Sequence, residues 1–241
     1  SKEELVKEID ELNKRVNDLL EELLRKSEKL HKEILELLER LLREIISLLR
    51  RILEIVERRL EDETLKRVLE KLEETLRRLK KKVDEELKRL EDENRRLKEE
   101  MDRLLRKSAE ELERLREKVV RDGGSGDEVL ARLLELHTED LKHAREVLDE
   151  VLRLNKKALD LIRAILTEVL KLIKELLKLI EAGADEDELR RLLEDIERKI
   201  EALLRELKKE SEEIRKRLKM SCAQESDKSR KIKKAIEELK K

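Results

Sequence analysis

Apart from its 63 Asp and Glu residues, this chain has few side chains that could ligate a metal or act as acid and base, with three His, one Cys and no Tyr among 241 residues. Two of the His stand three residues after a carboxylate, in Glu28-Lys-Leu-His31 and Asp140-Leu-Lys-His143. Glu-x-x-His motifs hold metal pairs in helical bundles, but such a site needs two motifs at one height with two more inward Glu. The helix register developed below separates His31 from His143 by ~18 Å, at about 1.5 Å per residue. The sequence therefore predicts no metal, no cofactor and no catalytic site, so that the protein is not an enzyme.

The only Cys lies in a segment whose composition differs from the rest of the chain. Residues 219–226 read Lys-Met-Ser-Cys-Ala-Gln-Glu-Ser, within surroundings made almost wholly of Leu, Ile, Val, Glu, Lys and Arg. Cys222 follows Leu218 by four residues, which places it on the same helix face, so we expect it to point inward. As an interpretation based on the residues alone, Cys222 is either an ordinary buried small residue or part of an inserted functional segment.

Composition predicts a helical protein and excludes several classes of partner. Charged residues make up 52% of the chain, the net charge is −1, and Phe, Trp, Tyr and Pro are absent. A chain rich in Ala, Glu, Lys, Leu and Arg with helical periodicity is typical of long helices or coiled coils. Without aromatic stacking residues or a basic stripe, we expect no nucleic-acid partner. With no signal peptide and no long apolar run, we expect no membrane partner and no targeting signal, so that the protein is cytosolic when expressed.

Glycines and charged turns divide the chain into four predicted helices. The Gly-rich stretch at 122–127 is typical of a flexible linker. At 181–188, Gly183 suits the position after a helix end and Asp185 suits the N-cap of the next helix. A third break is predicted near 61–64, where Asp62 could cap a helix, although one unbroken helix over 1–121 is the alternative. The predicted helices span about 1–60, 64–121, 127–182 and 185–241.

Apolar residues recur with a period close to that of the α-helix, about 3.6 residues. Leu5, Leu23 and Leu41 mark a near-repetition along one face. Such a period lets helices run nearly straight, whereas a strict heptad would supercoil them. Adjacent apolar pairs, which widen the stripe toward two neighbours, are Leu37-Leu38, Leu41-Leu42, Leu48-Leu49, Leu133-Leu134 and Leu176-Leu177. Because short connections favour antiparallel neighbours, the sequence predicts an all-α, long, nearly straight, antiparallel up-down-up-down four-helix bundle, which we expect to be a monomer.

Polar residues on the apolar stripes fall at two common heights of this bundle. One predicted layer contains Ser27, His31, Asn94, Asn155 and Ser211. The second contains Asn17, Ser108, His137 with Thr138, and Ser229. Buried polar groups are costly unless they are paired, and paired ones fix register and partner choice. We therefore predict two buried polar networks, and chance surface positions are the alternative.

The apolar stripe of the last helix weakens toward its C-terminal end. Its predicted core contacts are Leu189, Leu193, Ile196, Ile200, Leu203, Leu207, Ile214, Leu218, Ile232, Ile236 and Leu239. Between Leu218 and Ile232 the sequence offers the core only Met220, Cys222 and Ala223. We expect this part of the helix to be held least firmly.

The composition, straight periodicity, polar layers and Gly/Ser link together resemble the de novo designed latching cage-key switches (LOCKR). This resemblance covers the whole chain and is architectural. It implies a designed protein in which 1–182 form a three-helix cage and 185–241 a detachable latch helix. It also implies a partner, a helical key peptide that resembles the latch and displaces it.

The segment 218–226, Leu-Lys-Met-Ser-Cys-Ala-Gln-Glu-Ser, resembles "LPMSCAQES" from the C-terminal tail of ornithine decarboxylase, a ubiquitin-independent proteasome-targeting degron. We call 218–226 the degron-like segment. Its residues that match the tail are Leu218, Met220, Ser221, Cys222, Ala223, Gln224, Glu225 and Ser226, and the central Cys-Ala pair maps onto Cys222 and Ala223. Lys219 replaces a Pro, which would break a helix interior. The resemblance implies a degron hidden by the latch and a proteasome partner when the latch is open. A structural bundle or binding scaffold without switching is the alternative.

Overall fold

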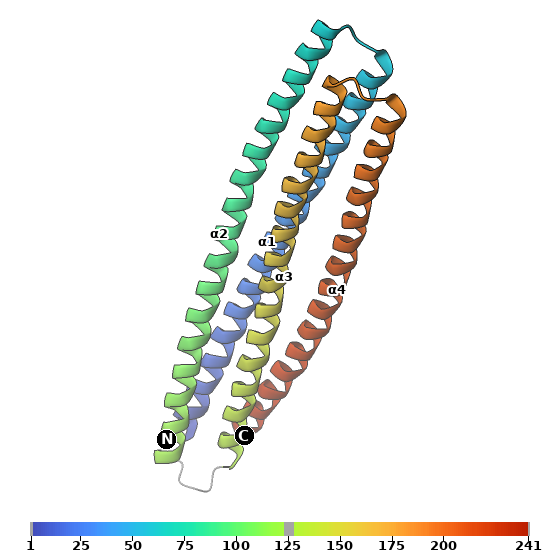
Figure 1. Cartoon of the computed structure of the whole chain (residues 1–241). Coiled ribbons are helices and arrows are strands. Elements are labelled where there is room, and N and C mark those ends of the chain that lie inside the picture. The colour runs from blue at the N-terminus through green and yellow to red at the C-terminus, as the bar shows by residue number, and fades with distance from the viewer. Residues whose placement is uncertain (1, 123–127, 241) are drawn as a thin grey trace. The chain divides into compact units, whose positions relative to one another are not determined.

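The computed structural model describes the backbone of residues 2–122 and 128–240, together with their side chains except those of 2, 122, 129, 218, 221–226, 229, 239 and 240. The chain is all-α: the described residues form four helices and no strand (Figure 1). In chain order they are α1 (Lys2–Arg58), α2 (Asp62–Asp122), α3 (Glu128–Glu181) and α4 (Glu186–Lys240). The linker predicted at 122–127 lies, apart from its first residue, outside the described residues.

The turn between α1 and α2 forms without Gly or Pro, so the alternative of one helix over 1–121 is wrong. Arg59 adopts a left-handed conformation with φ of 48°, which reverses the chain directly after the last residue of α1. The backbone N–H of Leu65 then donates to the carbonyl of Glu61 at 2.8 Å. Glu61 is therefore the N-cap, and Asp62, predicted as the cap, is already the first residue of α2.

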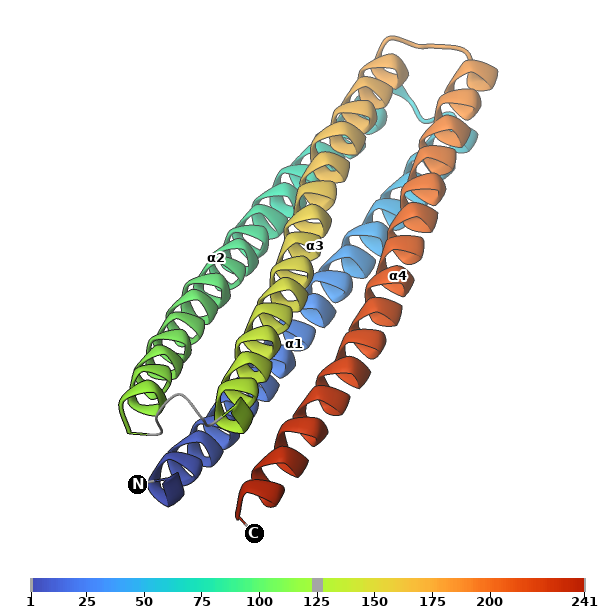
Figure 2. The ribbon, with the colours of Figure 1, turned by 90° about the horizontal axis from the view of Figure 1, so that it is seen from below.

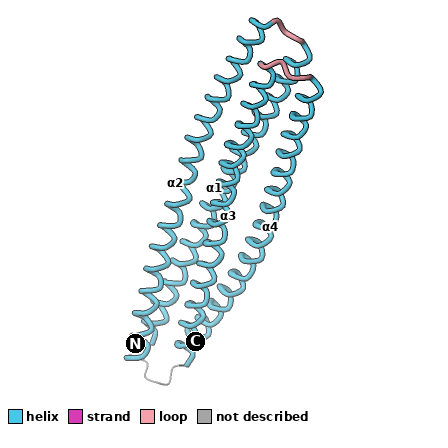
Figure 3. The backbone as a smooth tube through the Cα atoms, viewed as in Figure 1, coloured by secondary structure: helices cyan, strands magenta, loops and turns pink. Residues whose placement is uncertain are grey.

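The turn between α3 and α4 confirms the predicted roles of Gly183 and Asp185. Gly183 has φ of 78°, and its N–H donates to the carbonyl of Ile180 at 3.1 Å. The N–H of Ala184 donates to the carbonyl of Leu179 at 3.0 Å, which completes a Schellman motif. The N–H of Leu189 donates to the carbonyl of Asp185 at 3.1 Å, as expected for a helix N-cap. Figure 3 shows both described connections as short loops between the helices.

The described structure divides into two compact units, each of which takes segments from all four helices. Unit 1 comprises Ser1–Lys29, Asn94–Leu154 and Glu212–Lys241. Unit 2 comprises Leu30–Glu93 and Asn155–Ser211. The helices themselves continue without a break through the residues at which one unit ends and the other begins.

Each unit has an aliphatic core built from the predicted stripes. In unit 2, both members of the pairs Leu37-Leu38, Leu41-Leu42, Leu48-Leu49 and Leu176-Leu177 are buried. In unit 1 the pair Leu133-Leu134 is buried as well. The doubled apolar positions therefore face the core, as predicted. Fully burying one Leu or Ile stabilises a fold by roughly 1.5–3 kcal/mol, so these stripes provide the main driving force for packing.

Ion pairs set the pairing of α1 with α2 within each unit. In unit 1, Glu8 pairs with Lys118 at 3.3 Å, Arg15 with Glu111 at 3.0 Å and Lys26 with Glu100 at 3.1 Å. In unit 2, Arg40 pairs with Glu86 at 2.9 Å. In unit 1, as the residue numbers of the α1 partners rise, the residue numbers of their α2 partners fall.

Candidate functional site

The helix α4 contains the degron-like segment and is continuous through it, as Figure 2 shows along the orange-to-red ribbon. Eight of the predicted core contacts are buried: Leu189, Leu193, Ile196, Ile200, Leu207, Ile214, Ile232 and Ile236. Leu203 is only half-buried, as is its neighbour Leu204. Two adjacent residues point about 100° apart on a helix, so this pair straddles the edges of the buried stripe. The side chains of Leu218 and Leu239 lie outside those that the structure describes.

Within the degron-like segment, Lys219 and Met220 are the residues with described side chains, and both are exposed. Met220 is 66% exposed, so the prediction that it contributes to the core is wrong. Met220 follows the buried Ile214 by six residues, which places it roughly 240° away around the helix and toward solvent. The side chains of Leu218, Ser221, Cys222, Ala223, Gln224, Glu225 and Ser226 lie outside the described set.

The described contacts of α4 leave a long interval without a buried anchor. Ile214 is 4% exposed and Ile232 is 0% exposed. Between them, none of the side chains that the structure describes is buried. Lys228 is the one described residue of this interval that is half-buried. The degron-like segment lies wholly within this interval.

Of the first predicted polar layer, unit 2 holds His31, Asn155 and Ser211. His31 and Asn155 are buried, and their Nδ1 and Oδ1 atoms are 3.0 Å apart. Because an amide oxygen only accepts, His31 Nδ1 must carry the proton and donate. Ser211 is half-buried. The helices α1 and α3 are thus joined by one buried hydrogen bond, at a position that the sequence predicted.

The other members of this layer, Ser27 and Asn94, belong to unit 1. Ser27 is buried, but its Oγ donates to the carbonyl of Leu23 in its own helix at 2.8 Å. Asn94 is half-buried, and its Nδ2 donates to the carbonyl of Leu152 on α3 at 3.2 Å. A hydroxyl that bonds back to residue i−4 needs no partner from another helix. Burial of Ser27 therefore does not require a cross-helix network.

The second predicted polar set lies in unit 1. Ser108 and His137 are buried, whereas Asn17 is half-buried. Ser108 Oγ donates to the carbonyl of Leu104 at 2.9 Å, again within its own helix. Thr138 is exposed and accepts a hydrogen bond from Arg116 Nη2 at 3.1 Å. Ser229 has a side chain outside the described set.

Sequence reasoning missed two buried polar residues of unit 1, Asn13 and Asp140. Their exposed fractions are 6% and 1%, and one side-chain oxygen of each is buried without a hydrogen-bond partner. Asp140 follows His137 by three residues, so it shares the buried face of α3. That spacing was visible in the sequence, but Asp140 was considered only as a partner of His143.

Burial shifts the pKa values of the titratable residues on this face of α3. Loss of hydration lowers the pKa of His137 from 6.5 to about 4. Loss of hydration raises the pKa of Asp140 from 3.8 to about 6, while the positive charge of Lys228 on α4 acts in the opposite direction. Burial and the charge of Lys228 lower the pKa of His143, and Glu146 opposes them. At neutral pH the site therefore holds two neutral imidazoles and an ionised, buried carboxylate.

The carboxylate and the imidazole of the first carboxylate–His motif differ in burial. His31 is buried but Glu28 is exposed, so the two side chains do not share an environment. Among the described side chains there is no group of three or more His, Cys, Asp or Glu residues arranged to hold a metal ion.

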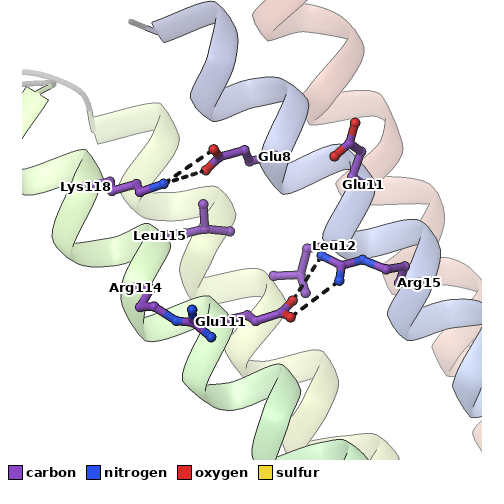
Figure 4. Close-up of a pocket in the computed structure, with 8 residues that line it drawn as sticks. All are labelled: Glu8, Glu11, Leu12, Arg15, Glu111, Arg114, Leu115 and Lys118. Carbon is purple, nitrogen blue, oxygen red and sulfur yellow. Dashed lines mark hydrogen bonds and ion pairs between the residues drawn. The ribbon is translucent and has the colours of Figure 1, made fainter.

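A surface hollow of about 220 Å³ lies between α1 and α2 in unit 1 (Figure 4). Its floor contains Leu12 and Leu115, and the pairs Glu8–Lys118 and Arg15–Glu111 cross it. Exposed ion pairs of this kind contribute about 0–1 kcal/mol each. These ion pairs span the hollow. They can favour one register of α1 against α2, and they leave little open space for a ligand.

Comparisons with known proteins place the chain in no family: no protein-family model matches it, and no curated protein matches it. None of the helices in the described residues combines the length and apolar character needed to cross a membrane.

Proposed function

We propose that this protein is a designed switch of the LOCKR type, in which α4 is a latch that hides the degron-like segment. In the closed state, α4 docks on a cage formed by α1, α2 and α3. A helical key that resembles α4 displaces it, and the freed tail is engaged by the proteasome. Cys222 and Ala223 would form the central recognition element of that tail.

The proposed architecture is a monomeric, antiparallel, up-down-up-down four-helix bundle. Its support is the register of the α1–α2 ion pairs in unit 1, where the residue numbers of the α2 partners fall as those of the α1 partners rise. In unit 2, Lys157 pairs with Glu210 at 2.6 Å. Lys157 lies near the N-terminal end of that unit's α3 segment and Glu210 near the C-terminal end of its α4 segment, as expected for antiparallel neighbours. A short turn at Gly183 is suited to this arrangement.

One observation carries the switching proposal: between Leu218 and Ile232 the sequence of α4 contains no Leu, Ile or Val, and the degron-like segment extends from Leu218 over the first half of this interval. Each missing Leu or Ile removes roughly 1.5–3 kcal/mol of stabilisation. Local opening of this interval therefore requires less free energy than unfolding of the whole molecule. A competitor helix can then exchange with this end of α4 while the segment around Leu189, Leu193 and Ile196 stays docked.

The key must supply a large preference for the open state. Moving a two-state equilibrium from 1:99 to 99:1 requires about 5.5 kcal/mol of differential binding. A key helix obtains this preference only by burying the cage surface that α4 leaves. It must also outcompete α4, which is tethered to the cage and so has a high effective concentration. We therefore expect the intact chain to respond weakly to key, and a chain with a weakened latch to respond strongly.

The test is the cellular lifetime of a fluorescent fusion with and without a key peptide copied from α4. The latch is weakened by placing Asn at Ile232 and Ile236, two anchors with exposed fractions of 0% and 2%. The matched control places Asn at Ile196 and Ile200, which are equally buried but lie in unit 2. We expect key-dependent loss of the first variant, and Cys222→Ala added to it should abolish that loss.

Equal lifetimes under all these conditions would contradict the degron proposal. The alternative function would then be a structural bundle or binding scaffold. What favours this alternative is the spread of eight buried aliphatic anchors over α4, which would hold the helix in place in a purely structural protein.

A further inference from the structure

In unit 1, the carboxylate of Asp140 is buried on α3 without full hydrogen bonding. Its residue is 1% exposed, and its Oδ1 atom has no hydrogen-bond partner. An isolated ion inside a protein is expensive because it loses its hydration, and the cost is offset only by a counter-charge or hydrogen bonds. The neighbouring His137 on the same face of α3 offers no positive charge, since burial holds it neutral.

The counter-charge comes from α4. Lys228 is half-buried, and its charge acts on both Asp140 and His143 of α3. It belongs to the interval between Ile214 and Ile232, where no described side chain of α4 is buried. The Arg217–Glu150 ion pair joins α4 to α3 in unit 1. Lys228 lies eleven residues further along α4 and Asp140 ten residues earlier on α3, so in antiparallel helices the two residues lie at about the same height.

An ion pair of the same polarity joins α3 and α4 elsewhere in unit 1. Arg217 of α4 forms an ion pair with Glu150 of α3. Unit 2 shows the opposite polarity on the same two helices, because there Lys157 of α3 pairs with Glu210 of α4. Within unit 1, α3 thus presents acidic groups to α4, and α4 presents basic groups to α3.

We propose that Asp140 is a specificity-determining residue of the surface on which α4 docks in unit 1. It selects a helix that places a cationic side chain at the position of Lys228. The occupant of this surface is a basic amphipathic helix, with a second cation at the position of Arg217. A helix with a neutral or acidic residue at the Lys228 position leaves the Asp140 carboxylate buried without a counter-charge, so it docks less well.

This inference deepens the proposed function and rests on it for the identity of the exchanging helix, since the key would have to carry the same cations. The electrostatic coupling between Asp140 and Lys228 can nevertheless be tested without a key or a proteasome. The matched substitutions are Lys228→Met and, as a control, Lys233→Met, because Lys233 is exposed on the same helix.

The first measurement is an NMR titration of the Asp140 carboxyl in the full chain. In Lys228→Met we expect the pKa of Asp140 to rise, because an opposite charge nearby favours the ionised form. In Lys233→Met we expect no change. An unchanged pKa of Asp140 in Lys228→Met would overturn the proposal.

The second measurement is amide hydrogen exchange of the α4 segment 212–240 at pH 8, where Asp140 is ionised and His137 and His143 are neutral. Loss of the counter-charge destabilises the docked helix while Asp140 is ionised, so Lys228→Met should speed exchange relative to Lys233→Met. Adding Asp140→Asn should remove this difference. If Lys228→Met acts equally with Asp140→Asn present, Lys228 works through packing alone and the proposal is wrong.

The two levels of interpretation fail separately. Loss of the Asp140–Lys228 coupling refutes the specificity proposal and leaves the switch proposal intact. Conversely, intact coupling without key-dependent turnover supports the charge contact and refutes the switch.

Discussion

The two buried titratable residues of α3 should make opposite contributions to the pH dependence of stability. The pKa of Asp140 is raised from 3.8 to about 6, so its contribution is present at low pH and is lost as pH rises through 6. The pKa of His137 is lowered from 6.5 to about 4, so its contribution is present at neutral pH and is lost as pH falls toward 4. Over pH 4 to 6.5 the two effects oppose each other.

Each contribution amounts to about 3 kcal/mol, since a shift of one pKa unit corresponds to about 1.36 kcal/mol. In Asp140→Asn only the His137 contribution remains. As pH falls from 7 to 4, the free energy of unfolding of this variant should therefore drop by up to about 3 kcal/mol relative to that of the parent chain. In His137→Gln only the Asp140 contribution remains, so the free energy of unfolding of this variant should rise by a similar amount relative to the parent over the same range.

The assay is denaturant unfolding of the parent chain and both variants at pH 4, 5, 6 and 7. Free energies of unfolding are compared as differences from the parent at each pH, which cancels the many surface carboxylates common to all three proteins. Opposite slopes for the two variants are expected. Difference profiles that are flat for both would refute the assignment of buried, opposed ionisation at His137 and Asp140.

Three further predictions concern the turn, the buried polar pair and α4. Gly183→Ala should lower the free energy of unfolding by about 1–2 kcal/mol, measured by denaturant titration, because an Ala at φ of 78° is strained. Asn155→Leu should cost about 1–3 kcal/mol by leaving His31 Nδ1 without its acceptor, and adding His31→Leu should recover part of that loss in a double-mutant cycle. In hydrogen exchange, amides of 215–231 should open with less free energy than those of 189–207, and equal protection of both would contradict the weak-anchor interpretation.

Sequence periodicity predicted much of the fold, because burial of aliphatic side chains dominates helix packing. The doubled positions such as Leu41-Leu42 are buried as expected, and Gly183 marks a turn that needs a left-handed residue. The cap at 61–64 was misplaced because Arg59, which has a side chain, adopts the left-handed conformation that normally indicates Gly. Local composition gave no signal for that residue.

The polar positions were harder to predict, because a polar residue on a stripe has several ways to satisfy its hydrogen bonds. His31 and Asn155 pair across helices, as the register suggested. Ser27 and Ser108 bond to their own helix backbones instead, which the sequence pattern does not distinguish. Asp140 was overlooked because a carboxylate on an apolar face is rare, so its burial became visible only with the tertiary structure.

Thiol labelling of Cys222 tests the central claim most directly, because it is the only Cys among 241 residues and reports on the degron-like segment alone. The labelling rate of the native chain is compared with that of the denatured chain, which sets the upper limit. A peptide copied from α4 is then added, with a control peptide carrying Asn at the positions of Ile196, Ile200 and Ile232. A latch that hides the segment predicts slow labelling that the α4 peptide accelerates and the control peptide does not. Labelling at the same rate with and without the α4 peptide would contradict it.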